Sequence, residues 1–260
     1  MKAICADLRD EYEALDFIVE GLDANGWRTL TPFLGWDIHY EIAHIAYFDG
    51  TARLAATMPD DFNKHVQELF ANLDKWDEIF GQVRDMPDQD LLQYWREQRN
   101  ALIAALEPMG PKDRLPWYGP PMSARSFAAA RIMETWAHGQ DVADALRVRR
   151  QATPRLRHIA HLGVTTYGWS FAVKGLAKPE AQIRVELSGP EGDLWAWGPE
   201  DAAQSIVGPA EDFCLVVTQR RNVADTALQP VGEAATQWMQ VAQCFAGPPA
   251  HGPKPGERAW

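Results

Sequence analysis

The sequence has few cysteines, no long hydrophobic run and no long run of lysine or arginine. Its three cysteines, Cys5, Cys214 and Cys244, stand far apart among 260 residues. An odd and widely spaced set gives neither a disulfide framework nor a cysteine-based zinc site, so we expect a reducing cytoplasm. No stretch approaches the ~20 apolar residues of a membrane span. Because the first residues turn acidic at once, we also expect no secretory signal peptide.

The charge balance narrows the classes of partner. The formal net charge is −11, and no basic run interrupts it. An acidic chain of this kind is a poor candidate for binding nucleic acid or an anionic membrane surface. Hydrophobic residues make up 46% and charged residues 23%, as in an ordinary soluble globular protein. We therefore expect neither a nucleic acid nor a membrane as a partner. The protein is expected to be a monomer or a homodimer.

Residues 1–150 are predicted to form a helical bundle. Leu8, Tyr12, Leu15 and Val19 recur at three- and four-residue steps, which gives one apolar stripe of a helix. Asp37 and Ser123 are placed to cap the helices that follow them. Four main helical segments are expected, over about residues 8–22, 38–58, 59–107 and 124–146. The third segment contains one helix over 62–80 and is interrupted at Pro87.

Residues 151–247 are predicted to form a small α+β domain. The stretch 155–176 keeps helical character, and 181–187 then alternates apolar and polar residues as a strand does. Turn residues and a returning strand follow, and further segments complete the unit. The returning strand is expected over 194–198, and a third strand over 204–208. Helices are expected over 209–220 and 232–247. Residues 248–260 are expected to form a disordered tail after this domain.

The stretch "RIMETWAHGQD" (residues 131–141) carries an acid and a histidine on a packing face. Glu134 and His138 are four residues apart, so they lie one above the other on the predicted last helix of the bundle. An unpaired carboxylate there would cost several kcal/mol of desolvation. Spacing alone leaves three interpretations open, namely a metal site, a buried ion pair and a solvated face.

A metal site needs a third ligand, and "DIHYEIAHIAYFDG" (residues 37–50) offers two histidines. Ile38, Ile42 and Ile45 mark the buried side of that helix. His44 lies at the border of this side, and His39 lies roughly 140° away from it around the helix axis. Helical periodicity does not choose between them.

Two motifs together resemble the DinB-like family, in particular its mycothiol-dependent maleylpyruvate isomerase branch. They are "WDIHYEIAHIAYFDG" (residues 36–50) and "ARIMETWAHGQDVADAL" (residues 130–146). The family pattern of Trp-x7-His and Glu-x-x-x-His selects Trp36 and His44, then Glu134 and His138. His39 falls outside it. The C-terminal half resembles an uncharacterised actinobacterial subgroup through "RVELSGPEGDLWAWGP" and "DFCLVVTQRR".

The resemblance implies an α+β protein with a metal-binding four-helix bundle and a small C-terminal α/β domain of the sterol-carrier-like type. It also implies zinc on His44, Glu134 and His138, with mycothiol as co-substrate at the open position. The zinc-bound thiolate would attack an activated small-molecule electrophile, in isomerisation or in S-transfer.

The resemblance further places Arg220 as the cation that stabilises negative charge on the substrate, while adjacent Arg221 is expected at the surface. Asp141 is a candidate for orienting a ligand histidine or for acting as a base. Aromatic residues expected to wall the pocket, or to pack in the core, are Trp36, Trp117 and Tyr118. The pocket is expected between the two domains. The alternatives are a metal-dependent hydrolase and a non-catalytic metalloprotein that binds a small molecule.

Overall fold

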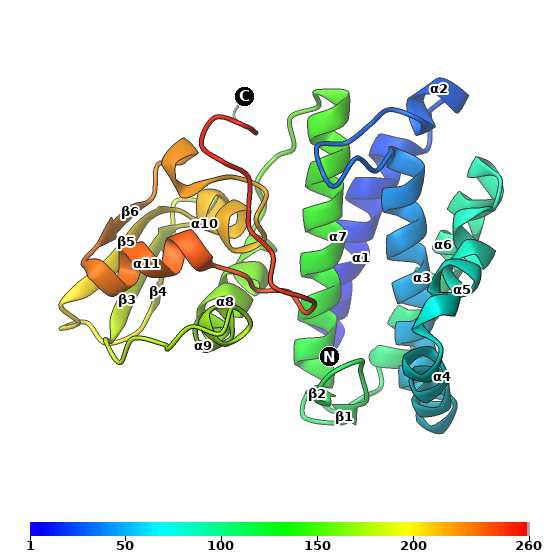
Figure 1. Ribbon diagram of the computed structural model, residues 1–260, viewed down its shortest axis with the longest axis horizontal. Helices are drawn as coiled ribbons and strands as arrows, with labels where there is room; N and C mark the ends of the chain where they lie inside the picture. Colours follow the sequence, from blue (N-terminus) through cyan, green and yellow to red (C-terminus); the bar gives the residue numbers. More distant parts are fainter. Residues whose placement is uncertain (259–260) are drawn as a thin grey trace. The chain divides into compact units, whose positions relative to one another are not determined.

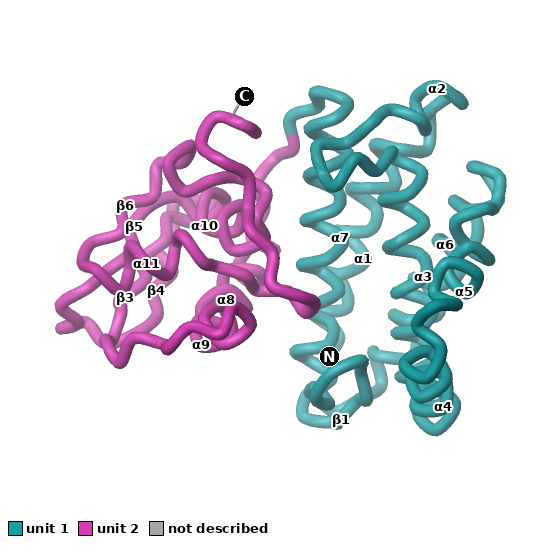
Figure 2. Tube along the Cα trace, in the orientation of Figure 1, with its two compact units in different colours: residues 1–149 teal, residues 150–260 magenta. Residues whose placement is uncertain are grey.

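The computed structural model describes residues 1–258, which divide into two compact units. The units span residues 1–149 and 150–260 (Figure 2). The first is helical apart from one short hairpin, and the second contains a four-stranded sheet. The chain is therefore an α+β protein, as the sequence predicts. Within the described residues, no helix is both long and apolar enough to cross a membrane.

Four long helices build the first unit (Figure 1). They are α1 (Lys2–Val19), α3 (Ile38–Thr57), α6 (Asp88–Leu106) and α7 (Ala124–Leu146). Helix α3 packs against α6 and α7, and α1 packs against the same two helices. The short α2 (Ala24–Trp27) and the hairpin of β1 (Arg114–Leu115) and β2 (Met122–Ser123) lie between them in sequence.

Two predicted helix starts are confirmed by their capping bonds. The Asp37 carboxylate accepts a hydrogen bond from the Tyr40 backbone N–H at 2.8 Å, at the start of α3. The Ser123 hydroxyl accepts one from the Ser126 backbone N–H at 3.1 Å, at the start of α7. Each cap satisfies a backbone donor that has no partner inside the helix. These two helices carry the predicted metal ligands.

The prediction of a single helix over residues 62–80 is wrong. The chain forms α4 (Pro59–Ala71), a 3₁₀ turn η1 (Leu73–Lys75) and α5 (Trp76–Arg84). Asn72 leaves helical geometry at ψ 53°, which breaks the hydrogen-bond ladder between α4 and α5. The apolar spacing of the segment continues across this break, so periodicity alone did not reveal it.

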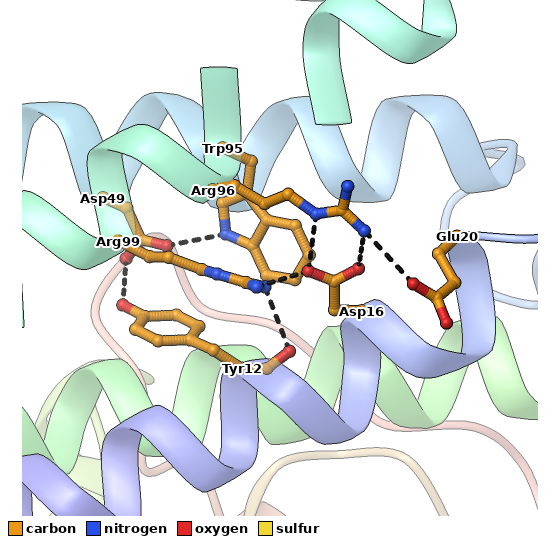
Figure 3. A network of polar contacts seen from close by, with 7 residues as sticks. All are labelled: Tyr12, Asp16, Glu20, Asp49, Trp95, Arg96 and Arg99. Carbon is orange, nitrogen blue, oxygen red and sulfur yellow. Dashed lines mark hydrogen bonds and ion pairs between the residues drawn. The ribbon is translucent and has the colours of Figure 1, made fainter. Parts of the chain in front are cut away.

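A buried polar network joins α1, α3 and α6 (Figure 3). Asp49 of α3 accepts hydrogen bonds from the Tyr12 hydroxyl at 2.6 Å and from the Trp95 indole N–H at 3.0 Å. Asp16 of α1 accepts from Arg96 at 2.5 and 2.9 Å and also pairs with Arg99. Both carboxylates are buried, so each needs these donors to offset the desolvation cost.

The second unit is built on a sheet with strand order β4-β3-β5-β6. Strands β3 (Ile183–Ser188) and β4 (Leu194–Trp197) form an antiparallel hairpin, and β3 pairs in parallel with β5 (Gln204–Pro209). The three predicted strands are confirmed. Strand β6 (Gln229–Val231) was missed because Pro230 lowers its strand propensity, and it lies at the sheet edge, where proline is tolerated.

Helices and a short 3₁₀ turn complete the second unit (Figure 1). They are α8 (Leu156–Thr165), α9 (Tyr167–Ala172), α10 (Ala210–Val217), η2 (Val223–Asp225) and α11 (Glu233–Val241). The ambiguous stretch 209–220 is helical as predicted, whereas the last predicted helix ends at Val241. The sterol-carrier-like character of this unit stays a prediction.

The C-terminal segment was expected to be a disordered tail over 248–260. In the structure, the Asn222 side chain donates a hydrogen bond to the Pro253 carbonyl at 2.9 Å. The Gly256 N–H donates to the Asp225 carboxylate at 2.8 Å. Residues 248–258 therefore follow the surface of the second unit, and residues 259–260 lie outside the described part.

Asp16→Asn is expected to lower the free energy of unfolding by about 2–4 kcal/mol at pH 7. Burial by itself would raise the pKa of Asp16, but the hydrogen bonds and charges of Arg96 and Arg99 hold it below its ordinary value. The stabilisation is therefore present above the ordinary carboxyl range near pH 4 and is lost as the pH falls through the lowered pKa. Urea denaturation at pH 7 and pH 3 measures this loss.

The matched control for Asp16 is Glu20→Gln. The Glu20 carboxylate lies 3.4 Å from Arg96 and is 52% exposed. An exposed pair of this kind contributes less than about 1 kcal/mol. An equal loss of stability in both variants would contradict a special role for the buried pair.

Candidate metal centre

The structure brings the three predicted metal ligands together at one point of the first unit. His44 comes from α3, and Glu134 and His138 come from α7. Their ligand atoms all lie within 4.8 Å of one another. The Nε2 atom of His138 is 3.4 Å from the Glu134 carboxylate. These three side chains form the His–Glu–His cluster.

The cluster follows from the packing of α7 on α3. Four residues separate Glu134 from His138, so both side chains project from the same side of α7. Helix α3 packs against this side and supplies His44. His138 is buried, while the Glu134 side chain is 24% exposed and His44 is partly exposed. The cluster thus lies at the edge of the packed seam, where a ligand from outside has access.

Glu41 fixes the orientation of the His138 ring. Its Oε2 atom lies 2.7 Å from Nδ1 of His138, and its Oε1 atom accepts a hydrogen bond from the Thr31 hydroxyl at 2.7 Å. The Glu41 carboxylate is fully buried. A carboxylate at Nδ1 holds a proton on that nitrogen, so Nε2, which faces Glu134, is the nitrogen that a metal ion would take. Burial raises the pKa of Glu41, and the bonds to His138 and Thr31 oppose this rise.

The orienting role predicted for Asp141 stays a prediction, and a different carboxylate lies closest to His138. The nearest carboxylate oxygen of Asp141 lies 4.0 Å from Nδ1 of His138, beyond hydrogen-bond distance, and Glu41 occupies the position. Sequence reasoning missed Glu41, although it precedes His44 by three residues and so lies on the same side of α3. Glu41, His138 and Asp141 form a second group of potential metal ligands, on the Nδ1 side of the His138 ring.

Glu134 is held in its charged form. Burial by itself would raise its pKa, but the hydrogen bond and charge of His138 and the positive charges of Arg131 and His44 lower the pKa to about 2. A carboxylate in this environment is ionised at neutral pH and is available as an oxygen ligand.

Aromatic rings surround the cluster. Trp36 lies parallel to the His138 ring, with 6.0 Å between centroids and 9° between planes, and its centroid is 5.2 Å from that of His44. Phe33 meets His138 edge-on at 5.5 Å, and Phe48 lies 4.8 Å from His44. Trp36 is therefore positioned at the cluster, as predicted. These rings restrict the motion and hydration of the ligand histidines.

Trp117 and Tyr118 lie one layer further from the cluster. Trp117 stacks on Phe62 at 5.6 Å and 1°, and Tyr118 meets Phe48 edge-on at 5.7 Å. No ring contact between either residue and His44 or His138 is found within the described residues. Their predicted role as pocket walls stays a prediction, and their observed role is packing.

Both candidate arginines belong to the second unit, and both are buried. Arg220 donates from Nη1 to the Thr218 carbonyl at 2.7 Å, and Arg221 donates from Nη1 to the Arg220 carbonyl at 2.8 Å. The expectation of a surface position for Arg221 is therefore wrong, because its side chain folds back onto the main chain. The predicted action of Arg220 on a substrate stays a prediction.

The three cysteines are free and buried. None belongs to a group of metal-ligating side chains within residues 1–258. Burial raises the pKa of Cys5 and of Cys214. A thiol with a raised pKa is a weak nucleophile at neutral pH.

The fold and the cluster define a two-unit α+β protein with a His–Glu–His candidate metal centre in its helical unit. A family model described as mycothiol maleylpyruvate isomerase N-terminal domain matches residues 8–143. Two uncharacterised proteins of Mycobacterium tuberculosis strains are each 46% identical over 248 residues, which is 95% of this chain and 96% of each relative. The chain belongs to the mycothiol maleylpyruvate isomerase N-terminal domain family.

Two solved structures show the same fold. The crystal structure of the mycothiol-dependent maleylpyruvate isomerase is 15% identical, with a TM-score of 0.52. A mutant of that enzyme is 14% identical, with a TM-score of 0.54. Each comparison covers 84% of this chain and 89% of the other. A second family model, described as wyosine base formation, matches residues 179–229 of the second unit.

His39 lies apart from the cluster and has a structural role. Its Nδ1 is 2.6 Å from the Asp88 carboxylate, and its Nε2 is 2.6 Å from the Arg84 carbonyl. The ring thus joins the start of α3 to the end of α5 and the start of α6. The family pattern, which leaves His39 out, agrees with this placement.

His39→Gln is expected to lower the free energy of unfolding by about 1–3 kcal/mol, because partly buried acceptors on two helices lose their donor. Urea denaturation followed by circular dichroism measures the change. The same substitution at exposed His251 is the control, expected within about 0.5 kcal/mol of wild type. Equal effects at the two positions would remove the structural role of His39.

Proposed function

We propose that the protein is a zinc-dependent enzyme that uses mycothiol, a small-molecule thiol, for isomerisation or S-transfer on an activated small molecule. The observation that carries this proposal is the His–Glu–His cluster, with Nδ1 of His138 held by the Glu41 carboxylate. Family membership supports the thiol, because the family is described by its mycothiol isomerase.

The donor set fits a divalent zinc ion. Two imidazole nitrogens and one carboxylate oxygen are ligands that zinc prefers, and three protein ligands are typical of catalytic sites with a position left for substrate. The contact between Glu41 and Nδ1 of His138 is the carboxylate–histidine arrangement that commonly supports a ligating imidazole. Because Glu134 is ionised at neutral pH, the cluster needs no proton loss from its acid before a cation binds.

A zinc ion held there would lower the pKa of a bound thiol, so that a thiolate is available at neutral pH. The residues of this chain then have separate tasks. Glu41 holds the His138 ring and its tautomer, and Trp36 and Phe33 exclude water from one side of the imidazole. The buried cysteines stay inert, so the chain contributes no competing thiol.

The acids near the cluster favour thiol chemistry over hydrolysis. A metal-dependent hydrolase uses a carboxylate or histidine as a base beside the metal-bound water. Within the described residues, Glu41 and Asp141 lie at Nδ1 of His138, on the far side of the ring from Nε2. Neither is placed to take a proton from a ligand at the cluster. The hydrolase and the non-catalytic binding protein are therefore outcomes of the tests below.

His44→Ala and His138→Ala are each expected to remove most bound zinc, because each takes one of three ligands. Metal content after dialysis, measured by mass spectrometry, checks this. His39→Ala is the control and should keep one zinc per chain. Zinc that survives both ligand substitutions would place the metal elsewhere.

The nucleophile is expected to be an added thiol. In the variant Cys5→Ser, Cys214→Ser, Cys244→Ser, X-ray absorption of the zinc protein should show a sulfur neighbour at about 2.3 Å only after mycothiol is added. Maleylpyruvate isomerisation, tested directly, should likewise need mycothiol. Bound zinc with no sulfur neighbour at millimolar mycothiol would reject the thiol, and turnover in thiol-free buffer would support the hydrolase.

A further inference from the structure

We propose that Arg131 binds the anionic ligand that completes the metal centre, and that this residue makes the centre selective for anions over neutral ligands. This inference rests on the proposed function, since it concerns the same cluster. Arg131, Glu134 and His138 are spaced i, i+3 and i+7 on α7. At 100° per residue, they fall within about 60° of one another, so they form one stripe facing α3.

The pairing of Arg131 with Asp49 uses only part of its guanidinium. The Nε atom donates to Oδ1 of Asp49 at 2.8 Å. The same oxygen accepts from Tyr12, and the other carboxylate oxygen accepts from Trp95. Asp49 is thus served by donors from three helices. The parallel two-bond arrangement that arginine commonly makes with a carboxylate is prevented here.

A buried donor is left over. Nη2 of Arg131 has no hydrogen-bond partner among the described residues, and the residue is only 4% exposed. Leaving a buried charged N–H without an acceptor costs free energy that a purely structural ion pair would avoid. A ligand that brings an acceptor to this donor recovers that cost. The unused N–H therefore indicates a binding role in addition to the structural pair.

The charge of Arg131 acts on the cluster. Arg131 precedes Glu134 by three residues on α7, so it lies one helical turn away on the same side of the helix. A fixed cation beside a metal site repels the metal alone and attracts an anion that binds with it. An arginine in this place therefore favours a thiolate or carboxylate over a neutral molecule as the last ligand.

Cobalt(II)-substituted protein tests this, because its visible spectrum reports each ligand added to the metal. Wild type, Arg131→Gln and Arg131→Lys are titrated with azide, an anion, and with imidazole, a neutral ligand. Arg131→Gln should weaken azide binding by about ten- to a hundredfold, the effect of one charged hydrogen bond. Imidazole binding should change less than about twofold, and cobalt affinity should not fall. Azide affinity within twofold of wild type would overturn the proposal.

Two further variants keep the result interpretable. Arg131→Lys retains a cation for Asp49 but lacks the second donor, so it should fold and still lose azide affinity severalfold. Arg99→Gln removes a different buried arginine of the same bundle, paired with Asp16, and should leave azide binding unchanged. If Arg99→Gln weakens azide binding as much as Arg131→Gln, the effect is general destabilisation and the inference fails.

Failure of the underlying function gives a different result. A wild-type protein that binds no cobalt at a site dependent on His44 rejects the metal centre itself. Cobalt binding with equal anion affinity in wild type and both Arg131 variants rejects only the role of Arg131.

Discussion

The contact between α3 and α7 is the interaction on which the centre and its surroundings depend. Along this seam, Glu41 pairs with His138 and Asp49 pairs with Arg131. The numbers rise by eight on α3 while they fall by seven on α7, so the helices run antiparallel with matched spacing. A slip by one turn would separate Glu41 from His138 and Asp49 from Arg131, and would leave the buried guanidinium without its carboxylate. A buried ionised group without its partner costs several kcal/mol. The two polar pairs therefore fix the register of α3 against α7, which the small apolar side chains of α7 would not fix by themselves.

The cluster occupies the interval between these two pairs. His44 follows Glu41 by three residues and precedes Asp49 by five, and Glu134 lies between Arg131 and His138. At this level His44 of α3 meets Glu134 and His138 of α7, and the ligand atoms of the three side chains lie within 4.8 Å of one another. The register that the two flanking pairs set thus holds three potential metal-ligand atoms close together. Such an arrangement is stable when a cation is shared among them, which is the physical basis of the metal proposal.

The sequence predicts most of the helices and strands, but it does not predict which side chains pair with the buried charged groups. Helical periodicity and capping residues predicted α3 and α7, and the Glu-x-x-x-His spacing placed Glu134 and His138 together. The third ligand needed the family resemblance, because His39 and His44 both stand near apolar residues. Glu41 and Arg131 were missed for a different reason. Their roles depend on the register of one helix against another, which no local pattern encodes. The break between α4 and α5 was missed because the apolar spacing runs through it.

The charges around the cluster bear on the kind of molecule that completes it. A divalent ion bound there would meet the ionised Glu134 directly and the Glu41 carboxylate through His138. These two acids balance the ion, and Asp49 balances Arg131. A neutral fourth ligand would leave this balance unchanged and the Nη2 donor of Arg131 without an acceptor. An anion adds one negative charge next to a guanidinium whose Nη2 group has no acceptor. Helix α7 therefore carries two ligands of the proposed cation and a donor for the proposed anion, an arrangement that suits the proposed activation of a thiol.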